Sequence, residues 1–299
     1  MSLLGRMRRW LDGRDEVYGI NRRNVDLVYA HNRRDDYRLA DDKLIAKQLL
    51  ESAGVAVPKT LAVCRGLFEV EPAIEMLSDK EDFVVKPADA SGGLGILVAG
   101  RRIEPGRWRR VGGGTIDLEG LRFHLANIVF GAFSRGELQD QAFVEERVQA
   151  HSVVAALWDE GLSDIRVLTL RRKPMMAMLR VPTALSGGRA NLHQGGLGLA
   201  IDLESGEVTR AVCSGELVTR HPDNGIALTG FAIPYWSEVL EVAERAAAAV
   251  PLGFLGVDIV LDETRGPLVL EINARPGIEI QNVHGSGLGI VMRRMGDPS

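Results

Sequence analysis

The chain has 299 residues, 45% hydrophobic and 25% charged, so it can bury a large core, which excludes a disordered or disulfide-held protein. Its 36 basic and 40 acidic side chains give a formal charge of −4, too balanced for a general nucleic-acid binder. The two cysteines, Cys64 and Cys213, lie far apart without CxxC spacing, so we expect a reducing, cytoplasmic location.

The first part of the chain, residues 1–40, is polar and rich in arginine, and we expect it to be a separate N-terminal segment. No stretch approaches the roughly 20 consecutive apolar residues that a membrane span needs. One face of a predicted helix, beside several arginines, carries Leu3, Leu4, Met7, Trp10 and Leu11. This face either packs on its own domain, which the periodicity favours, or lies on an anionic membrane.

Helices and strands alternate after residue 40. The segment 41–55 predicts a helix, because an aspartate can cap its start, its apolar residues share one face, and Gly54 ends it. Further helices are expected at 72–77, 118–133 and 236–250, and strands at 58–64, 82–86, 96–99, 141–148, 165–170, 174–179 and 198–203. The strands at 256–261 and 268–272 are predicted to pair as an antiparallel hairpin around a charged turn.

A glycine-rich loop at residues 88–95 lies between two predicted strands. A Rossmann or Walker loop must open a helix, so this loop is instead the tip of a hairpin. Its glycines permit backbone N–H groups to close over phosphates. Lys86 ends the strand before the loop, where its ammonium group would reach those phosphates. The alternative is a strand-end lysine that extends into solvent.

A candidate metal site lies in the predicted C-terminal hairpin. Asp258 interrupts an apolar strand, while Glu271 and Asn273 alternate on the next strand and so share one face. Strand pairing would place Asp258 opposite them. Two carboxylates and an amide oxygen suit Mg²⁺, with phosphate oxygens as further ligands. The alternative is a solvent-facing polar edge, but strands this apolar favour the metal, because a buried carboxylate without a cation is costly.

A basic cluster follows the glycine-rich loop. It consists of Arg101, Arg102, Arg107, Arg109 and Arg110. Trp108 is the only aromatic residue among them, so the cluster lacks the stacking partners of a nucleic-acid platform. A solvated face is the favoured interpretation, and a surface for an anionic acceptor or lipid is the alternative.

The order of motifs along the chain resembles that of the ATP-grasp superfamily. The motifs are VVKPADASGGLG, FVEERV, SDIR, RANLHQGG, GVDI and LEINARPG, together with Lys43 in a helix. They are most similar to the ribosomal-protein-S6 glutamate ligase type, closest to the α-L-glutamate ligase-like branch, which overlaps sugar-transfer-associated ATP-grasp proteins. The resemblance implies an α+β fold with two α+β subdomains that clasp ATP in residues 41–287, after a shortened N-terminal region.

The resemblance also implies boundaries and roles. We expect a loop-bearing subdomain at about 84–148, a metal-binding subdomain at 149–287, which starts with an apparent insertion at 149–162, and a tail at 288–299. ATP contacts are implied for Lys43, Lys86, Ser91, Gly92, Gly93, Gly95, Glu145, Glu146, Val148 and Asp164. Groups near the transferred acyl phosphate are implied at Arg180, Arg189, Asn191 and Arg275. Magnesium ligands, for two ions or with Mn²⁺ instead, are implied at Asp258, Glu271 and Asn273.

The function implied is that of an ATP- and Mg²⁺-dependent carboxylate–amine ligase that works through an acyl phosphate, with glutamate addition as one version. Its substrates would be small-molecule or peptide carboxylates and amines, and not nucleic acid. Two other functions stay open: an ATP-grasp protein of cell-surface polysaccharide biosynthesis, and a nucleotide-binding regulatory scaffold without turnover. A homo-oligomer and a peripheral contact with a membrane protein also stay open.

Overall fold

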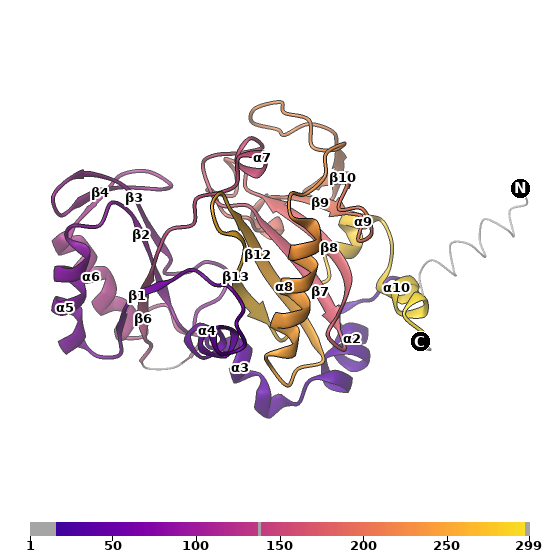
Figure 1. Cartoon of the computed structure of the whole chain (residues 1–299), viewed down its shortest axis with the longest axis horizontal. Helices are drawn as coiled ribbons and strands as arrows, with labels where there is room; N and C mark the ends of the chain where they lie inside the picture. The colour runs from indigo at the N-terminus through magenta and orange to yellow at the C-terminus, as the bar shows by residue number, and fades with distance from the viewer. Residues whose placement is uncertain (1–15, 137–138, 297–299) are drawn as a thin grey trace, which may run out of the picture.

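The computed structural model describes residues 16–136 and 139–296, which form two antiparallel sheets and the helices that pack on them (Figure 1). Within these residues, no helix combines the length and the apolar composition needed to cross a membrane. The amphipathic helix predicted around residues 3–11 lies outside the described residues.

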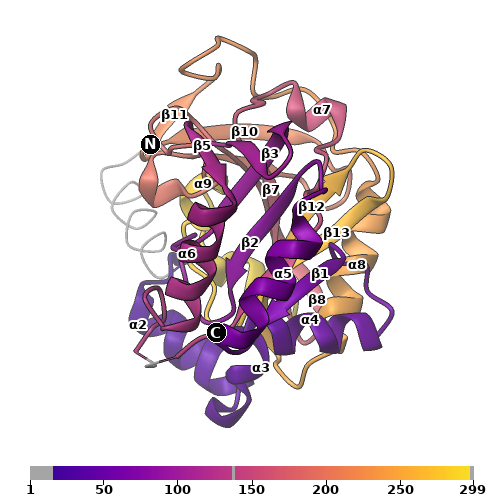
Figure 2. The ribbon, with the colours of Figure 1, turned by 90° about the vertical axis from the view of Figure 1, so that its left-hand side faces the viewer.

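The first sheet has six strands in the order β1-β6-β2-β3-β4-β5. Their bounds are β1 Thr60–Cys64, β2 Phe83–Pro87, β3 Leu97–Glu104, β4 Arg107–Arg110, β5 Thr115–Asp117 and β6 Ala142–Glu145. The helices of this unit are η3 (Leu67–Glu69), α5 (Val70–Leu77) and α6 (Leu118–Val129), and the last two cover one face of the sheet (Figure 2). The core between α5, α6 and the sheet contains Phe83, Trp108 and Leu125, all fully buried.

The second sheet has seven strands in the order β11-β10-β9-β8-β7-β12-β13. Their bounds are β7 Asp164–Leu170, β8 Lys173–Val181, β9 Leu197–Ile201, β10 Val208–Cys213, β11 Glu216–Val218, β12 Phe254–Asp262 and β13 Gly266–Asn273. Helix α8 (Trp236–Ala248) packs on β7, β8, β12 and β13. The remaining helices of this unit are α7 (Ser152–Ala155), η4 (Leu192–Gln194), α9 (Ile280–His284) and α10 (Leu288–Arg294).

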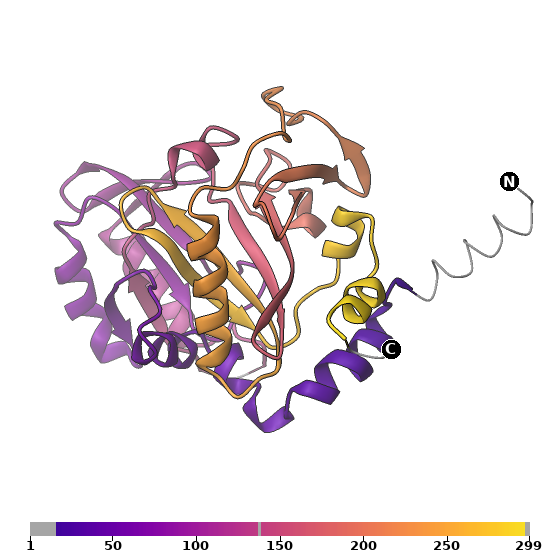
Figure 3. The same ribbon diagram turned by 45° about the vertical axis from the view of Figure 1, so that its right-hand side comes forward.

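The N-terminal segment packs on the second sheet, although the first sheet follows it in the chain (Figure 3). Its elements are α2 (Ile20–Arg23), the π-helix η1 (Asn24–Tyr29), η2 (Arg34–Asp36), α3 (Arg38–Asp41) and α4 (Lys43–Ser52). Tyr18, Leu27 and Leu50 are buried in the same core as the strands of the second sheet. The first sheet is therefore an insertion in the chain of the larger unit.

Several elements form where capping and alternation predict them. The helix predicted at 41–55 is α4, and Asp42 caps it by accepting hydrogen bonds of 3.0 and 3.1 Å from two backbone N–H groups of its first turn. The hairpin predicted at 256–272 is β12 and β13, which place Asp258 directly opposite Glu271. The two sheets with their helices confirm the predicted α+β class.

Other boundaries differ from the sequence pattern. The strand predicted at 141–148 ends at Glu145, because the chain then turns and the N–H group of Glu146 donates to the carbonyl of Lys59 at 2.9 Å. The helix predicted at 118–133 ends at Val129, since Gly131 then adopts a left-handed conformation with φ of 75°.

The limits of the two units also differ from the expected positions. The first sheet begins with β1, well before residue 84, because β1 pairs with β6 along its whole length. In the expected tail at 288–299, helix α10 packs Leu288 and Met292 into the larger core. The insertion expected at 149–162 contains α7, and Trp158 stacks on the buried His221 ring at a centroid distance of 4.9 Å.

Asn32 joins the N-terminal segment to the second sheet. Its side-chain amide donates to the carbonyl oxygens of Phe254 and Ala274 at 2.7 and 2.8 Å, and its Oδ1 accepts from the N–H group of Phe254 at 2.9 Å. Nearby, Arg23 donates to the carbonyl of Pro276 at 2.8 Å. These contacts fix the chain where β12 begins and where β13 has just ended.

Asn32→Ala should lower the free energy of unfolding by about 2–4 kcal/mol, because three buried backbone groups lose their side-chain partner. Urea denaturation followed by intrinsic fluorescence measures this loss. The control is Asn282→Ala, which removes an exposed amide that donates to Glu279, and it should change stability by less than about 0.5 kcal/mol. Equal midpoints for the two variants would contradict the anchoring role of Asn32.

Candidate functional site

Glu145 lies at the end of β6, where it is buried and forms ion pairs with two lysines. Its carboxylate accepts from Nζ of Lys47 on α4 at 2.8 Å and forms an ion pair with Lys86 on β2. Only 9% of the Lys47 side chain and 12% of the Lys86 side chain are exposed. Burial alone would raise the pKa of Glu145, but Lys86 and Lys47 outweigh burial and hold this pKa below its usual value.

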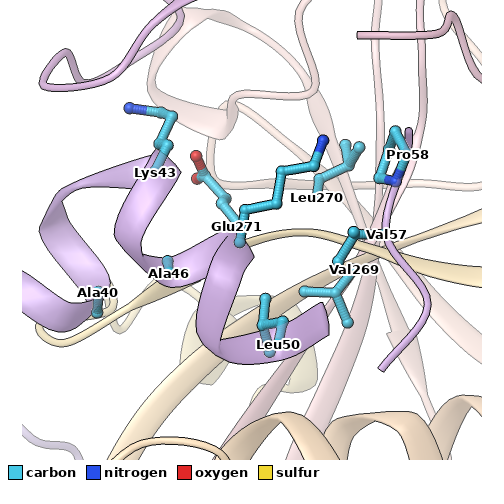
Figure 4. Close-up of a pocket in the computed structure, with 10 residues that line it drawn as sticks. Ala40, Lys43, Ala46, Leu50, Val57, Pro58, Val269, Leu270 and Glu271 are labelled. Atoms are coloured by element: carbon cyan, nitrogen blue, oxygen red, sulfur yellow. The ribbon is translucent and has the colours of Figure 1, made fainter. Parts of the chain in front are cut away.

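Lys43 lies one turn before Lys47 on α4 and contacts the glycine-rich loop. Its ammonium group donates to the carbonyl of Ala90, and its backbone N–H donates to the carbonyl of Ala88 at 3.1 Å. Burial lowers the pKa of Lys43, and the charge of Glu271 offsets part of this shift. Lys43 and Glu271 line the same small cavity between α4 and β13 (Figure 4).

The glycine-rich loop needs glycine at its tip. Gly93 has φ of 76°, and a Cβ atom there would lie 3.4 Å from Nε of Arg189, which comes from the larger unit. Gly95 has φ of 72°, and a Cβ atom there would meet the ring of Phe133 at 2.7 Å. The loop is therefore a tight turn of the first sheet that approaches the second unit near Arg189. Ser91 and Gly92 are exposed at the start of this turn.

Two arginines and two aspartates form a buried cluster on β7, β8 and β12. Arg166 donates to both oxygens of Asp258 at 2.7 and 2.6 Å. Arg180 donates to both oxygens of Asp164 at 2.5 and 2.7 Å, and also to Asp258 at 2.9 Å. Strand register explains the cluster, because Asp258 pairs with Arg166 and Asp164 pairs with Arg180.

The two aspartates of this cluster have opposite pKa shifts. Burial raises the pKa of Asp164, with Asp258 adding to the shift and Arg180 opposing it. Burial would also raise the pKa of Asp258, but Arg166 and Arg180 outweigh burial and lower it well below the usual range. Asp258 is therefore the anion that both guanidinium groups stabilise.

The three predicted magnesium ligands converge, but they do not form a ready-made set. The amide of Asn273 lies 3.3 Å from Asp258 and 3.4 Å from Glu271. Both oxygens of Asp258 accept from arginines, and in the described ranges no group of three or more histidine, cysteine or acidic side chains could hold a metal. Glu271 and Asn273 offer hard oxygen ligands, so they fit Mg²⁺, and Asp258 contributes negative charge beside them.

The predicted acyl-phosphate residues lie in separate places. Arg180 belongs to the buried cluster, whereas Arg275 forms an ion pair with Asp41 and stacks on Tyr37 at 5.0 Å from the ring centroid. Asp41 also accepts from Arg135 through its backbone carbonyl at 2.9 Å. Arg275 is thus held by the N-terminal segment at the edge of the site.

Other predicted residues make local contacts. Oδ1 of Asn191 accepts from the N–H group of His193 at 3.0 Å and caps η4. Glu146 pairs with the exposed Arg265 at 3.2 Å, and Val148 packs in a small apolar cluster. Their assigned roles at an adenine hinge or near a transferred group stay predictions.

The sequence patterns did not predict three residues of the site. Arg166 alternates with Asp164 in the SDIR motif, so period-2 geometry places both side chains on the face that meets Asp258. Lys47 follows Lys43 by one helical turn, and this spacing placed both on one face of α4. The pairing of Asp41 with Arg275 had no local signal, since 234 residues separate them.

Comparison with known proteins identifies the family. The family described as "Sugar-transfer associated ATP-grasp" matches residues 22–296. The chain therefore belongs to this ATP-grasp family, and the predicted membership of the superfamily is confirmed. One solved structure with a similar fold is a complex of biotin carboxylase from Campylobacter jejuni with β,γ-ATP. It is 17% identical, with a TM-score of 0.51, over 82% of this chain and 42% of that chain. This similarity supports the same fold.

Two curated relatives are named probable α-L-glutamate ligases. The protein from Mannheimia succiniciproducens is 26% identical over 249 residues, which cover 82% of this chain and 58% of that protein. The protein from Sodalis glossinidius is 29% identical over 251 residues, 84% of this chain and 62% of that protein. The chain thus spans about three fifths of the length of these relatives.

Glu145→Gln should destabilise the fold by about 3–5 kcal/mol, because Lys47 and Lys86 would stay buried without a neutralising carboxylate. Urea denaturation measures this loss. The control is Glu244→Gln, which removes an exposed ion pair with Lys173 at 2.9 Å and should cost less than about 1 kcal/mol. Losses of the same size would mean that Glu145 does no more for stability than a surface carboxylate.

Proposed function

We propose that this protein is an ATP-dependent carboxylate–amine ligase. In the reaction, a carboxylate oxygen takes the γ-phosphoryl group of ATP, which leaves ADP and an acyl phosphate. The amine nitrogen then attacks the acyl carbon, loses a proton and expels phosphate as the C–N bond forms. The observation that carries the proposal is the position of Lys43, which bonds the glycine-rich loop and lies across a cavity from Glu271.

The lysines on α4 and β2 are the groups that would bind the nucleotide phosphates. Lys47 and Lys86 share the single carboxylate of Glu145, and Lys43 lies near enough to Lys86 for their positive charges to interact. This excess of positive charge favours an anion at the base of the glycine-rich loop. Glu145 holds the ammonium group of Lys86 in place, so little reorganisation is needed when phosphates arrive.

Glu271 and Asn273 are the residues that would hold Mg²⁺, with Asp258 beside them. When bound, the ion neutralises charge on phosphate oxygens. The carboxylates of Asp164, Asp258 and Glu271 face the two guanidinium groups of Arg166 and Arg180, and this net negative charge favours a cation. The use of two ions, or of Mn²⁺ instead, stays a prediction.

Arg180 is the residue we assign to the acyl phosphate. It already bridges Asp164 and Asp258, so its guanidinium plane is fixed by the charge-assisted hydrogen bonds that it donates to both carboxylates. A fixed guanidinium can stabilise charge that develops on the phosphoryl and carbonyl oxygens. Arg275, Arg189 and Asn191 would contact the acid or amine substrate from the rim.

The names of the relatives support glutamate as the amino acid substrate. We propose that it is added to a small molecule or peptide. The family description mentions sugar transfer. It therefore supports a sugar-linked acceptor as a second candidate, and we propose that such an acceptor would belong to the assembly of cell-surface polysaccharide. An ATP-turnover screen with amino acids, acidic peptides and sugar acids separates the two by the mass of the product. If the acid carries ¹⁸O in its carboxylate, transfer of the label to phosphate supports the acyl phosphate. Absence of acid-dependent ADP release from every mixture would contradict a ligase.

Lys86→Met should reduce turnover at least about 100-fold, which corresponds to about 3 kcal/mol of transition-state stabilisation. The fold should persist, because Lys47 still neutralises Glu145 after the substitution. Steady-state ADP release and calorimetric titration with ATP measure the effect. The control is Lys80→Met, an exposed lysine of the same sheet unit. Turnover and ATP affinity like those of the wild type would show that Lys86 has only a structural role.

Glu271→Gln should also reduce turnover at least about 100-fold, because it removes one negative charge from the proposed metal position. ATP should still stabilise the variant thermally, since the lysines remain, but most of the magnesium dependence should disappear. Thermal shift and calorimetric titrations with and without Mg²⁺ test this. The control is Glu279→Gln, at a half-buried carboxylate that accepts from the exposed Asn282. Identical magnesium dependence in the variant and the wild type would exclude Glu271 as a ligand.

A further inference from the structure

The β3–β4 hairpin carries a groove that the proposed chemistry does not use. The groove has a volume of about 290 Å³ and is lined by Arg101, Arg102, Ile103 and Arg109, which we call the arginine groove. In the ladder, Arg102 pairs with Trp108, and Trp108 is fully buried in the core beneath α5 and α6.

The arginine groove lies on the face of the sheet away from these helices. Side chains alternate along a strand, so Arg109 points away from the face that Trp108 buries. On β3 the register shifts on both sides of Arg102, and Arg101 and Ile103 lie at these two bulges. A bulge places an extra residue opposite its partner strand, so both Arg101 and Ile103 can share the face of Arg109. Helices α5 and α6 lie on the far side of the first sheet from the second sheet, so the groove is on the side toward the second unit (Figures 1 and 2).

The arginine groove has more positive charge than the chain itself neutralises. Arg102 pairs with Glu81 at 2.8 Å, and the neighbouring Arg107 pairs with Glu104 at 3.3 Å. Arg101 and Arg109 form no ion pair with any of the residues in 16–136 and 139–296. Arg101 and Arg109 are both exposed, so an anion in the groove can be attracted by both charges.

We propose that the arginine groove binds an acidic peptide. This proposal rests on the proposed function, because the peptide would be the substrate that the ligase extends. Each guanidinium group of Arg101 and Arg109 can bind a side-chain carboxylate with two hydrogen bonds. Ile103 is 53% exposed and offers an apolar contact for the methylene groups of acidic side chains. A nucleic acid would need exposed aromatic rings for its bases, and Trp108 is buried.

The groove lies at a useful distance from the glycine-rich loop. Arg101 follows Gly95 by six residues along β3, which corresponds to roughly 20 Å in an extended strand. A peptide of about six residues spans that distance when it is extended. The groove would therefore hold the part of a peptide that is remote from its reacting end, and longer acidic peptides would bind more tightly than short ones.

The test is direct binding of fluorescein-labelled hexaglutamate, measured by anisotropy without ATP. Hexaglutamate should bind the wild type and hexaglutamine should not. The double variant Arg101→Ala/Arg109→Ala should bind at least about tenfold more weakly, because it loses two charge-assisted contacts. The control is Arg122→Ala on α6, whose arginine pairs with Glu71 outside the groove, and it should bind like the wild type. The double variant Arg101→Lys/Arg109→Lys should recover part of the affinity, and thermal melting should verify that all variants are folded.

Several results would overturn the proposal. The first is equal binding of hexaglutamate and hexaglutamine, and the second is equal binding by the wild type and the double alanine variant. The third is displacement of the peptide by an oligo-dT strand or by phosphatidylglycerol vesicles that bind more tightly through the same arginines. The outcome is separate from that of the ligase proposal, because the assay needs no turnover. If the protein binds the peptide through Arg101 and Arg109 but ligates nothing, the groove proposal is supported and the ligase proposal is contradicted.

Discussion

The ion pairs of Glu145 with Lys47 and Lys86 are the interaction on which the arrangement of the site depends. Lys47 is on α4, a helix that buries Leu50 in the larger core, whereas Glu145 and Lys86 are on the first sheet. One buried carboxylate therefore joins the two units and fixes the position of both lysines. Because burying these charges separately would be costly, the units must meet in this register for the site to exist.

The charges of the site are divided between its two sides. On the side of α4 and β2, lysines outnumber the carboxylate of Glu145. On the side of β7, β8, β12 and β13, carboxylates outnumber the guanidinium groups of Arg166 and Arg180. A polyanion that carries a divalent cation has the matching distribution of charge.

The sequence predicts those parts of the fold that local rules determine. Asp42 caps α4 through its own first turn, and alternation brings Asp258 opposite Glu271 in a hairpin with a short connection. The pairing of Lys47 with Glu145 links residues 98 positions apart, and that of Arg166 with Asp258 links residues 92 positions apart. No local pattern in the sequence identifies such distant partners. The convergence of Asp258, Glu271 and Asn273 could therefore be predicted, but the arginines that bind Asp258 could not.

The insertion of the first sheet into the larger unit affects how the protein is made on the ribosome. The strands of the first sheet all lie within residues 60–145, so this unit can fold as soon as that stretch emerges. The partners of Asn32 follow it by 222 and 242 residues. At about 5–20 residues per second, the N-terminal segment waits roughly 10–50 s for β12 and β13 to be synthesised. Until then, the core that buries Tyr18 and Leu27 lacks its residues from β12 and β13, so nascent chains are most prone to aggregate before β13 appears.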